Sequence, residues 1–274
     1  MKNRGLINNV FFRKVFIDYK WSILLYVSIV LLYGALMVGF FPSIKNQSLE
    51  FEKLLESYPP AFLEAFGMNS NSFNTVEGFL SVEYFSLMWI IIIGILIFSL
   101  GASIVSKEIE TGTSEFSFSL PIKRWRIFLN RFIASYLISM IVVFASLITV
   151  MIGAYFINES PNLKGFLDFF VVSLALIFFL LSLTAFFSSF SSNKGKVYGA
   201  CGWFFILSYL LHILAGINDK VENFYFFSFL KYYGDPGAIL TGGGINVENI
   251  LVLFLSGMIF LIFSLVITEK RDLL

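Results

Sequence analysis

Long stretches without charged residues dominate the sequence and alternate with shorter, charged connections. Six stretches contain no Asp, Glu, Lys or Arg: 21–41, 85–105, 132–157, 169–193, 197–218 and 249–268. A helix of about 20 apolar residues crosses the roughly 30 Å hydrocarbon core of a bilayer. The stretches lack the period-2 alternation that strands of a membrane β-barrel require. The pattern therefore predicts an all-α, polytopic membrane protein with six transmembrane helices.

The basic residues are distributed unequally between the two sides of the predicted helices. Fourteen of the 19 Lys and Arg residues fall in the N-terminal segment, the second and fourth connections and the C-terminal tail. An excess of Lys and Arg marks the cytoplasmic side of a membrane protein. The N- and C-termini are therefore both expected in the cytoplasm, which agrees with an even number of spans.

Three segments outside the predicted spans carry patterns of their own. Residues 1–20 mix apolar and basic positions, which predicts a cytoplasmic interfacial helix on the inner leaflet. The outer loop, 42–83, shows helical spacing on both sides of a Pro-Pro pair, which indicates two short amphipathic helices on the outer leaflet or a lid over the exit of a transport path. Residues 219–248 are apolar but interrupted by strong turn signals, which predicts re-entrant or interfacial half-helices before the sixth span.

The composition agrees with a lipid environment and excludes several classes of protein. The chain is 58% hydrophobic and 14% charged, with a mean hydropathy of +0.84, whereas soluble domains carry about 25% charged residues. A net charge of +1 does not provide the basic face that nucleic-acid binding needs. Its one cysteine, Cys201, can form neither a disulfide within the chain nor a metal cluster.

The connection at 106–127, between the second and third predicted spans, has the densest charge. It opens with acidic residues and closes with basic ones: Lys107, Glu108, Glu110, Glu115, Lys123, Arg124 and Arg126. Thr111 or Thr113 can cap the start of a helix, and Gly112 permits a bend. Pro121 would then end this helix before the third span begins. The segment predicts a short helix tangential to the membrane; the alternative is a solvated loop whose charges only set the topology.

The same segment resembles the loop of type-2 ABC exporter permeases, the ABC-2 family. The residues that carry the resemblance are Glu108, Glu110, Gly112, Thr113, Glu115, Leu120, Pro121 and Arg124. Segments 59–67 and 75–87 resemble the first outer loop of one branch of that family, and segment 228–236 resembles the part before the sixth span. Lys123 departs from the small polar residue of many relatives. The resemblance covers nearly the whole chain and implies a single ABC-2 type transmembrane domain over residues 1–274.

The resemblance implies a membrane-spanning permease subunit of an ATP-binding cassette exporter, located in a bacterial plasma membrane. Two cytoplasmic ATPase subunits would engage a coupling helix in 106–127, and a second permease copy or a paralogue would complete a homodimer or heterodimer. Thr111 joins the eight residues above as a candidate ATPase-coupling position. The chain has no G-x-x-x-x-G-K-S/T motif. It is therefore expected to be no enzyme and to bind no cofactor, with ATP and Mg bound by the partner.

The rival interpretation is a secondary transporter or channel that depends on no ATPase. Carriers of that kind usually hold ionisable residues at mid-bilayer, and the six stretches contain no Asp, Glu, Lys or Arg. His212 is the exception among titratable side chains, either as a hydrogen-bond partner between helices or as a proton carrier. An intramembrane enzyme is not expected from one His and one Cys. Few charges along the spans favour an amphipathic or apolar cargo, such as a peptide, lipid or antibiotic.

Overall fold

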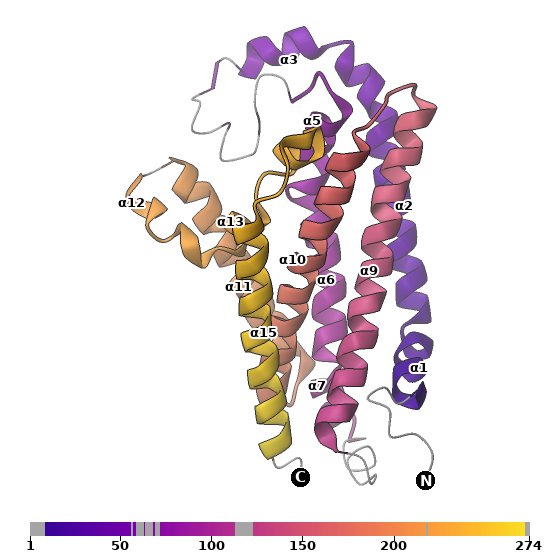
Figure 1. Cartoon of the computed structure of the whole chain (residues 1–274), viewed down its shortest axis with the longest axis vertical. Coiled ribbons are helices and arrows are strands. Elements are labelled where there is room, and N and C mark those ends of the chain that lie inside the picture. Colours follow the sequence, from indigo (N-terminus) through magenta and orange to yellow (C-terminus); the bar gives the residue numbers. More distant parts are fainter. Residues whose placement is uncertain are drawn as a thin grey trace.

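The protein is a long bundle of helices (Figure 1). The computed structural model describes residues 9–55, 57, 58, 63, 68, 72–112, 123–217 and 219–271, and these contain no β-strand. Five of the described helices are long and apolar enough to cross a membrane: α2 (Lys20–Lys45), α9 (Arg124–Phe156), α10 (Leu163–Phe190), α11 (Lys194–Ile217) and α15 (Val247–Lys270). A bent pair of helices passes the same test when it is counted as one span, which brings the number to six. The all-helical, polytopic prediction is confirmed.

The second span is bent, and it begins earlier than the sequence predicted. It consists of α5 (Val76–Leu80), the π-helix η1 (Ser81–Phe85) and α6 (Met88–Ala102), with a bend of 44°. Helical structure therefore begins at Val76, nine residues before the apolar stretch predicted at 85–105, whereas the end of the outer loop at residue 83 stays a prediction. Glu77 interrupts the apolar pattern, yet it is buried, and its Oε1 accepts a hydrogen bond from the Asn162 amide at 2.9 Å. A satisfied carboxylate can remain inside a helix that a hydropathy rule would cut.

The other spans also extend beyond their apolar stretches. The largest difference is in α9, which begins at Arg124 instead of the predicted residue 132. Its 33 residues extend about 50 Å at 1.5 Å each, more than the roughly 30 Å of the hydrocarbon core. Charged side chains end an apolar run without ending a helix, because they can reach the headgroup region while the backbone continues.

Helix α10 forms the centre of the bundle and lies between α6, α9 and α15 (Figure 1). Its most apolar stretch is 72% buried, against 11% for α11. Small residues bring its neighbours close: Gly101 of α6 lies against Thr184, and Gly257 of α15 lies against Phe178. Close approach at small residues is the usual way in which helices pack in lipid, where no hydrophobic force drives them together.

Several short elements lie at the two ends of the bundle (Figure 1). Helices α1 (Asn9–Asp18) and α7 (Ser106–Glu110) lie at one end, which also holds the end of α15, and we call it the α7 end. Helix α3 (Ser48–Leu55) and the start of α5 lie at the other, the α3 end. The second amphipathic helix expected in 42–83 falls on residues that are largely outside the described ones.

The connection between α11 and α15 is built from short helical pieces that are too short to cross a bilayer. They are α12 (Asp219–Glu222), η2 (Tyr225–Phe227), α13 (Phe229–Tyr233), α14 (Pro236–Ala238) and η3 (Ile239–Gly243). The Tyr233 hydroxyl donates to the Phe85 carbonyl at 3.0 Å, and His212 Nδ1 lies 2.7 Å from the Tyr225 hydroxyl. His212 therefore has the hydrogen-bond partner that the sequence left open. These bonds attach the connection to the second and fifth spans.

Replacing Gly165 with Ala should destabilise the fold. Gly165 lies in the first turn of α10, and a Cβ there would overlap the carbonyl oxygen of Leu240 in η3. Because backbone must shift to admit the methyl group, we expect a loss of about 1–3 kcal/mol, measured as a lower melting temperature in detergent. Gly199→Ala in α11 is the matched control, since nothing lies within 4 Å of its Cβ position. An unchanged melting temperature for Gly165→Ala would contradict this packing.

Candidate functional site

The candidate site is the corner through which the chain passes from α6 towards α9. Helix α6 ends at Ala102, a turn follows, and α7 runs from Ser106 to Glu110. The Thr111 hydroxyl donates to the Lys107 carbonyl at 2.8 Å and so closes the end of α7. Gly112 then adopts φ +69°, a left-handed conformation that glycine adopts without strain. The chain is thereby turned sharply after a five-residue helix.

Some of the predicted coupling residues lie in this corner, and others are not among the residues that the structure describes. Glu110, Thr111 and Gly112 lie at the end of α7, and Arg124 is the first residue of α9. Glu108 lies within α7, but its side chain is not described. Thr113, Glu115, Leu120 and Pro121 lie outside the described residues. The helix expected to end at Pro121 therefore stays a prediction, and α7 is a separate short helix that precedes it.

Ser106 attaches the corner to the end of α10. Its backbone amide donates to the Ser188 hydroxyl at 3.0 Å, and its own hydroxyl lies 3.0 Å from the Ser188 carbonyl and 3.1 Å from the Ser191 carbonyl. The Ser188 hydroxyl lies 3.2 Å from the carbonyl oxygen of Ala102, the last residue of α6. Ser106 and Ser188 are both fully buried. The end of α6, the start of α7 and the end of α10 therefore satisfy one another's polar groups.

Glu110 attaches the other end of α7 to α11. Its Oε2 accepts a hydrogen bond from the backbone amide of Lys194, the first residue of α11, at 3.2 Å. The first amides of a helix have no partners within the helix, and the helix dipole favours negative charge there. The sequence predicts that Glu110 couples the chain to an ATPase. In the structure, its carboxylate bonds to a transmembrane helix of its own chain.

Three further contacts join the corner and the end of α6 to α9 and to the junction of α1 and α2. Arg131 Nη1 of α9 donates to the Ile104 carbonyl at 2.9 Å. The Tyr19 hydroxyl lies 3.4 Å from the Ser99 carbonyl, and the Lys107 ammonium lies 5.3 Å from the centre of the Tyr19 ring. Burial raises the pKa of the Tyr19 phenol above its ordinary value. The phenol therefore stays protonated at neutral pH and can donate.

Arg124 lies apart from α7 and joins the start of α9 to the end of α15. Its Nη1 donates to the Arg271 carbonyl at 2.6 Å, and the Trp125 amide donates to Glu269 Oε2 at 3.2 Å. Arg271 Nη1 in turn donates to the carbonyls of Ser189 and Ser191 at 2.8 and 3.0 Å. Burial lowers the pKa of Arg271 below its ordinary value. The Ser191 carbonyl, just after α10, is thus shared between Ser106 of the corner and Arg271 at the end of the C-terminal helix.

Sequence reasoning missed the serines that hold the site. Ser106, Ser188 and Ser191 were part of the apolar pattern or its margins, and nothing in their spacing pairs them across more than eighty residues. The only signal was a serine-rich end to the fourth stretch, 188–192. Among the residues described, no group of three or more His, Cys, Asp and Glu side chains is placed to hold a metal ion. The arrangement offers hydrogen bonds between helices, which can transmit displacement.

Replacing Ser106 with Ala should loosen the corner. The change removes the hydroxyl that bonds to the buried Ser188 carbonyl, and an unsatisfied buried polar group costs about 1–3 kcal/mol. The Ser191 carbonyl keeps its bond from Arg271. We expect a lower melting temperature and, in a double-mutant cycle with Ser188→Ala, a coupling energy of at least about 0.5 kcal/mol. Ser256→Ala is the matched control, because that hydroxyl bonds only within α15 among the contacts described. Strict additivity of Ser106→Ala and Ser188→Ala would contradict the shared network.

Comparison with known proteins places the chain in a family. A family model described as "ABC-2 family transporter protein" matches residues 14–273, a range that contains all the long helices and the corner. No match was found among curated proteins or among solved structures. Because the matched range is nearly the whole chain, the resemblance carried by the charged segment extends to the complete set of spans. The chain belongs to the ABC-2 family of transporter proteins.

Proposed function

We propose that the chain is the membrane-spanning permease subunit of an ATP-binding cassette exporter, driven by a separate cytoplasmic ATPase that engages the 106–127 segment. The observation that carries the proposal is the attachment of the α6–α7 corner. Hydrogen bonds from this corner reach α10 through Ser106, α11 through Glu110 and α9 through Ile104. A partner that displaced the corner would pull on several spans together.

The form of these attachments supports transmission of force. Helix α7 is short, so it cannot absorb a displacement by bending along its length. Its first residue is buried against α10 and its last bonds to the first residue of α11. Packed interiors respond to small shifts by moving between discrete arrangements, because they have little free volume to deform into. A shift of α7 would therefore become a rearrangement of α10 and α11 against the rest of the bundle.

The proposal assigns the α7 end to the cytoplasm of a bacterial cell. Most Lys and Arg residues belong to segments at this end, as the positive-inside rule expects. Helix α1 has the form of an interfacial helix: Phe11 and Val15 are buried, whereas Arg13 and Lys14 are exposed. Both chain termini would then be cytoplasmic, and α3 would lie at the outer leaflet.

The proposed assembly contains two ATPase subunits, which bind ATP and Mg, and two permease chains, alike or paralogous. Helix α11 supports a second permease chain or lipid as its neighbour, since large apolar side chains along it are exposed, among them Trp203, Leu207 and Leu214. The proposed cargo is amphipathic or apolar, such as a peptide, lipid or antibiotic. The long, uncharged faces of the spans favour such a cargo over a simple ion.

A purification experiment tests the class of transporter. We expect an affinity-tagged chain, extracted from its native membrane in mild detergent, to copurify with a polypeptide that hydrolyses Mg-ATP and is inhibited by orthovanadate. The physical reason is that the chain lacks a phosphate-binding motif of its own. If the purified chain binds no such subunit, and moves cargo in liposomes without ATP, the secondary transporter or channel becomes the better account.

Replacing Glu110 with Lys should uncouple ATP binding and hydrolysis in the partner from the movement of the spans of this chain. A cation at the N-terminus of α11 is disfavoured by the helix dipole and cannot accept the Lys194 amide. Spin labels at Tyr155→Cys, in the last turn of α9, and at Phe224→Cys, between α12 and η2, report the motion without knowledge of the cargo, and both residues are exposed. We expect the distance between the labels to change with ATP and vanadate in the otherwise unaltered assembly, and to stay fixed with Glu110→Lys.

Three comparisons control this experiment. Glu110→Gln keeps a hydrogen-bond acceptor and should preserve most of the distance change. Glu222→Lys makes the same change of charge on an exposed residue of α12 and should have no effect. Native Cys201 is fully buried, so it should not compete for the label. A normal response from Glu110→Lys would contradict a coupling role for this residue.

A further inference from the structure

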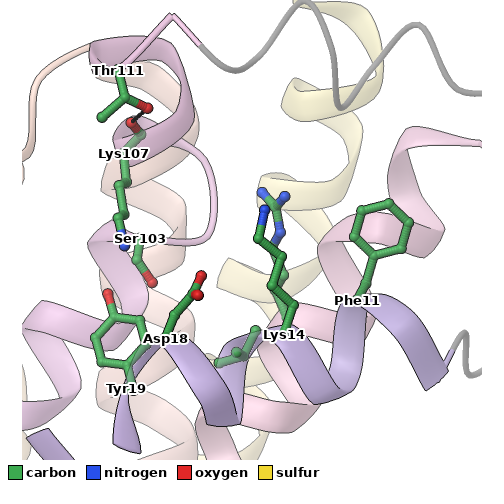
Figure 2. A pocket seen from close by; sticks show the side chains of 9 residues that line it. Phe11, Lys14, Asp18, Tyr19, Ser103, Lys107 and Thr111 are labelled. Atoms are coloured by element: carbon green, nitrogen blue, oxygen red, sulfur yellow. Dashed lines mark hydrogen bonds between the residues drawn. The ribbon is translucent and has the colours of Figure 1, made fainter. Parts of the chain in front are cut away.

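A cavity of about 270 Å³ lies beside the corner, between α1, the α6–α7 turn and α9 (Figure 2). Its walls come from three separate parts of the chain and consist of Phe11, Lys14, Val15, Asp18, Tyr19, Ser103, Lys107, Thr111 and Arg131. The force-transmitting contacts described above pass around this cavity and do not need it to be filled. These contacts therefore do not explain why charged side chains line the cavity.

Positive charge dominates the cavity. Among its described lining residues, Lys14, Lys107 and Arg131 are cationic and Asp18 is the one acid. In the part of the chain that the structure describes, neither Lys14 nor Lys107 forms a salt bridge. Lys107 instead lies over the Tyr19 ring. Arg131 is only 7% exposed, donates to the Ile104 carbonyl and lies over the Phe11 ring, so it adds positive charge to the wall of the cavity from a fixed position.

Lysine ammonium groups, rather than hydroxyl groups, are the hydrogen-bond donors that the described lining offers to a ligand. The Ser103 hydroxyl donates to the Leu100 carbonyl at 2.6 Å, and the Thr111 hydroxyl donates to the Lys107 carbonyl at 2.8 Å. Their protons are thus engaged within the chain. The donors that a ligand would meet belong to Lys14 and Lys107, which come from opposite walls of the cavity (Figure 2). An anion with several oxygen atoms could bond to both ammonium groups at once.

The volume and the position of the cavity narrow the class of anion. Drug-sized ligands occupy pockets of roughly 300–1,000 Å³, so this cavity suits a small group better than a whole cargo molecule. Trp21, which is 73% exposed at the start of α2, is the kind of side chain that lies at the headgroup level. Basic pockets between transmembrane helices on the cytoplasmic side recognise acidic lipid headgroups.

We propose that this cavity binds a phosphate group, presented either by an anionic lipid of the inner leaflet or by free phosphate. The lipid source rests on the orientation proposed above, whereas phosphate binding itself does not. The group would contact Lys14 of α1 and Lys107 of α7, and it would lie beside Arg131 of α9. The bound group would therefore hold α1 against the α6–α7 corner and make the packing between them more rigid.

Thermal unfolding of the purified chain in dodecyl maltoside tests the proposal. A ligand that binds the folded state raises the melting temperature with its concentration. The probes are dioctanoyl phosphatidylglycerol, inorganic phosphate and, as an anion without phosphate, oleate. We expect a saturable rise with a phosphate-bearing probe, and an apparent Kd about tenfold weaker in the double variant Lys14→Gln/Lys107→Gln, which loses two charge-assisted contacts.

Two further variants make the test specific to the cavity. Asp18→Asn removes the one described acid of the lining, so it should tighten binding, an effect that general loosening of the fold would not produce. Lys196→Gln/Lys270→Gln removes the same charge from exposed residues that do not line the cavity, so it should leave the Kd unchanged.

The pattern of responses decides between the sources and can overturn the proposal. A response to phosphatidylglycerol alone supports the lipid headgroup, and an equal, cavity-dependent response to inorganic phosphate supports free phosphate. The proposal fails if no phosphate-bearing probe shifts the melting temperature, if oleate acts with the same dependence on Lys14 and Lys107, or if the Lys196/Lys270 control weakens binding equally. Each result is obtained without an ATPase, so it is independent of the proposed export function.

Discussion

A helix that ends against other helices leaves backbone carbonyls and amides that water cannot reach, and the α7 end of this protein is organised by that constraint. The Ser188 hydroxyl of α10 donates to the carbonyl of Ala102 at the end of α6, and it accepts a hydrogen bond from the amide of Ser106 at the start of α7. In a low-dielectric surrounding each unsatisfied group would cost several kcal/mol. The same bonds that remove this cost also make the α6–α7 corner continuous with the central helix.

The position of α10 gives this attachment its consequences. Because α10 is the most buried of the long helices, contacting α6, α9 and α15, a load applied at its end is carried by the whole bundle. Helix α11, by contrast, is little buried in the chain, and α7 reaches it through Glu110. The corner therefore connects the most enclosed long helix to the most exposed one. That combination suits a subunit whose parts move relative to one another.

The sequence marked the segment that holds the candidate site, but it did not reveal most of the contacts that this segment makes within the chain. Charge density and the Gly112 position marked 106–127, and Glu110, Thr111 and Gly112 indeed lie where the chain turns. The sequence assigned Glu110 to a partner protein, whereas the structure also shows its bond to α11. Pairings such as Ser106 with Ser188 leave no periodic trace, since a serine in an apolar run is compatible with many environments. The cavity beside α1 was equally hidden, because its Lys14, Lys107 and Arg131 come from separate segments.

The sequence by itself determined the all-helical, membrane-spanning character of the chain and the approximate position of its long apolar helices, because crossing lipid imposes a length and an exclusion of charge that can be read residue by residue. It also determined the family, since the charged segment and the spans agree. Only the tertiary structure decided where the helices end, as at Val76, where the buried Glu77 is satisfied by Asn162. It alone brought the serines and the cavity lining together. Whether a polar group is tolerated inside a bundle depends on its partner, and that partner is distant in sequence.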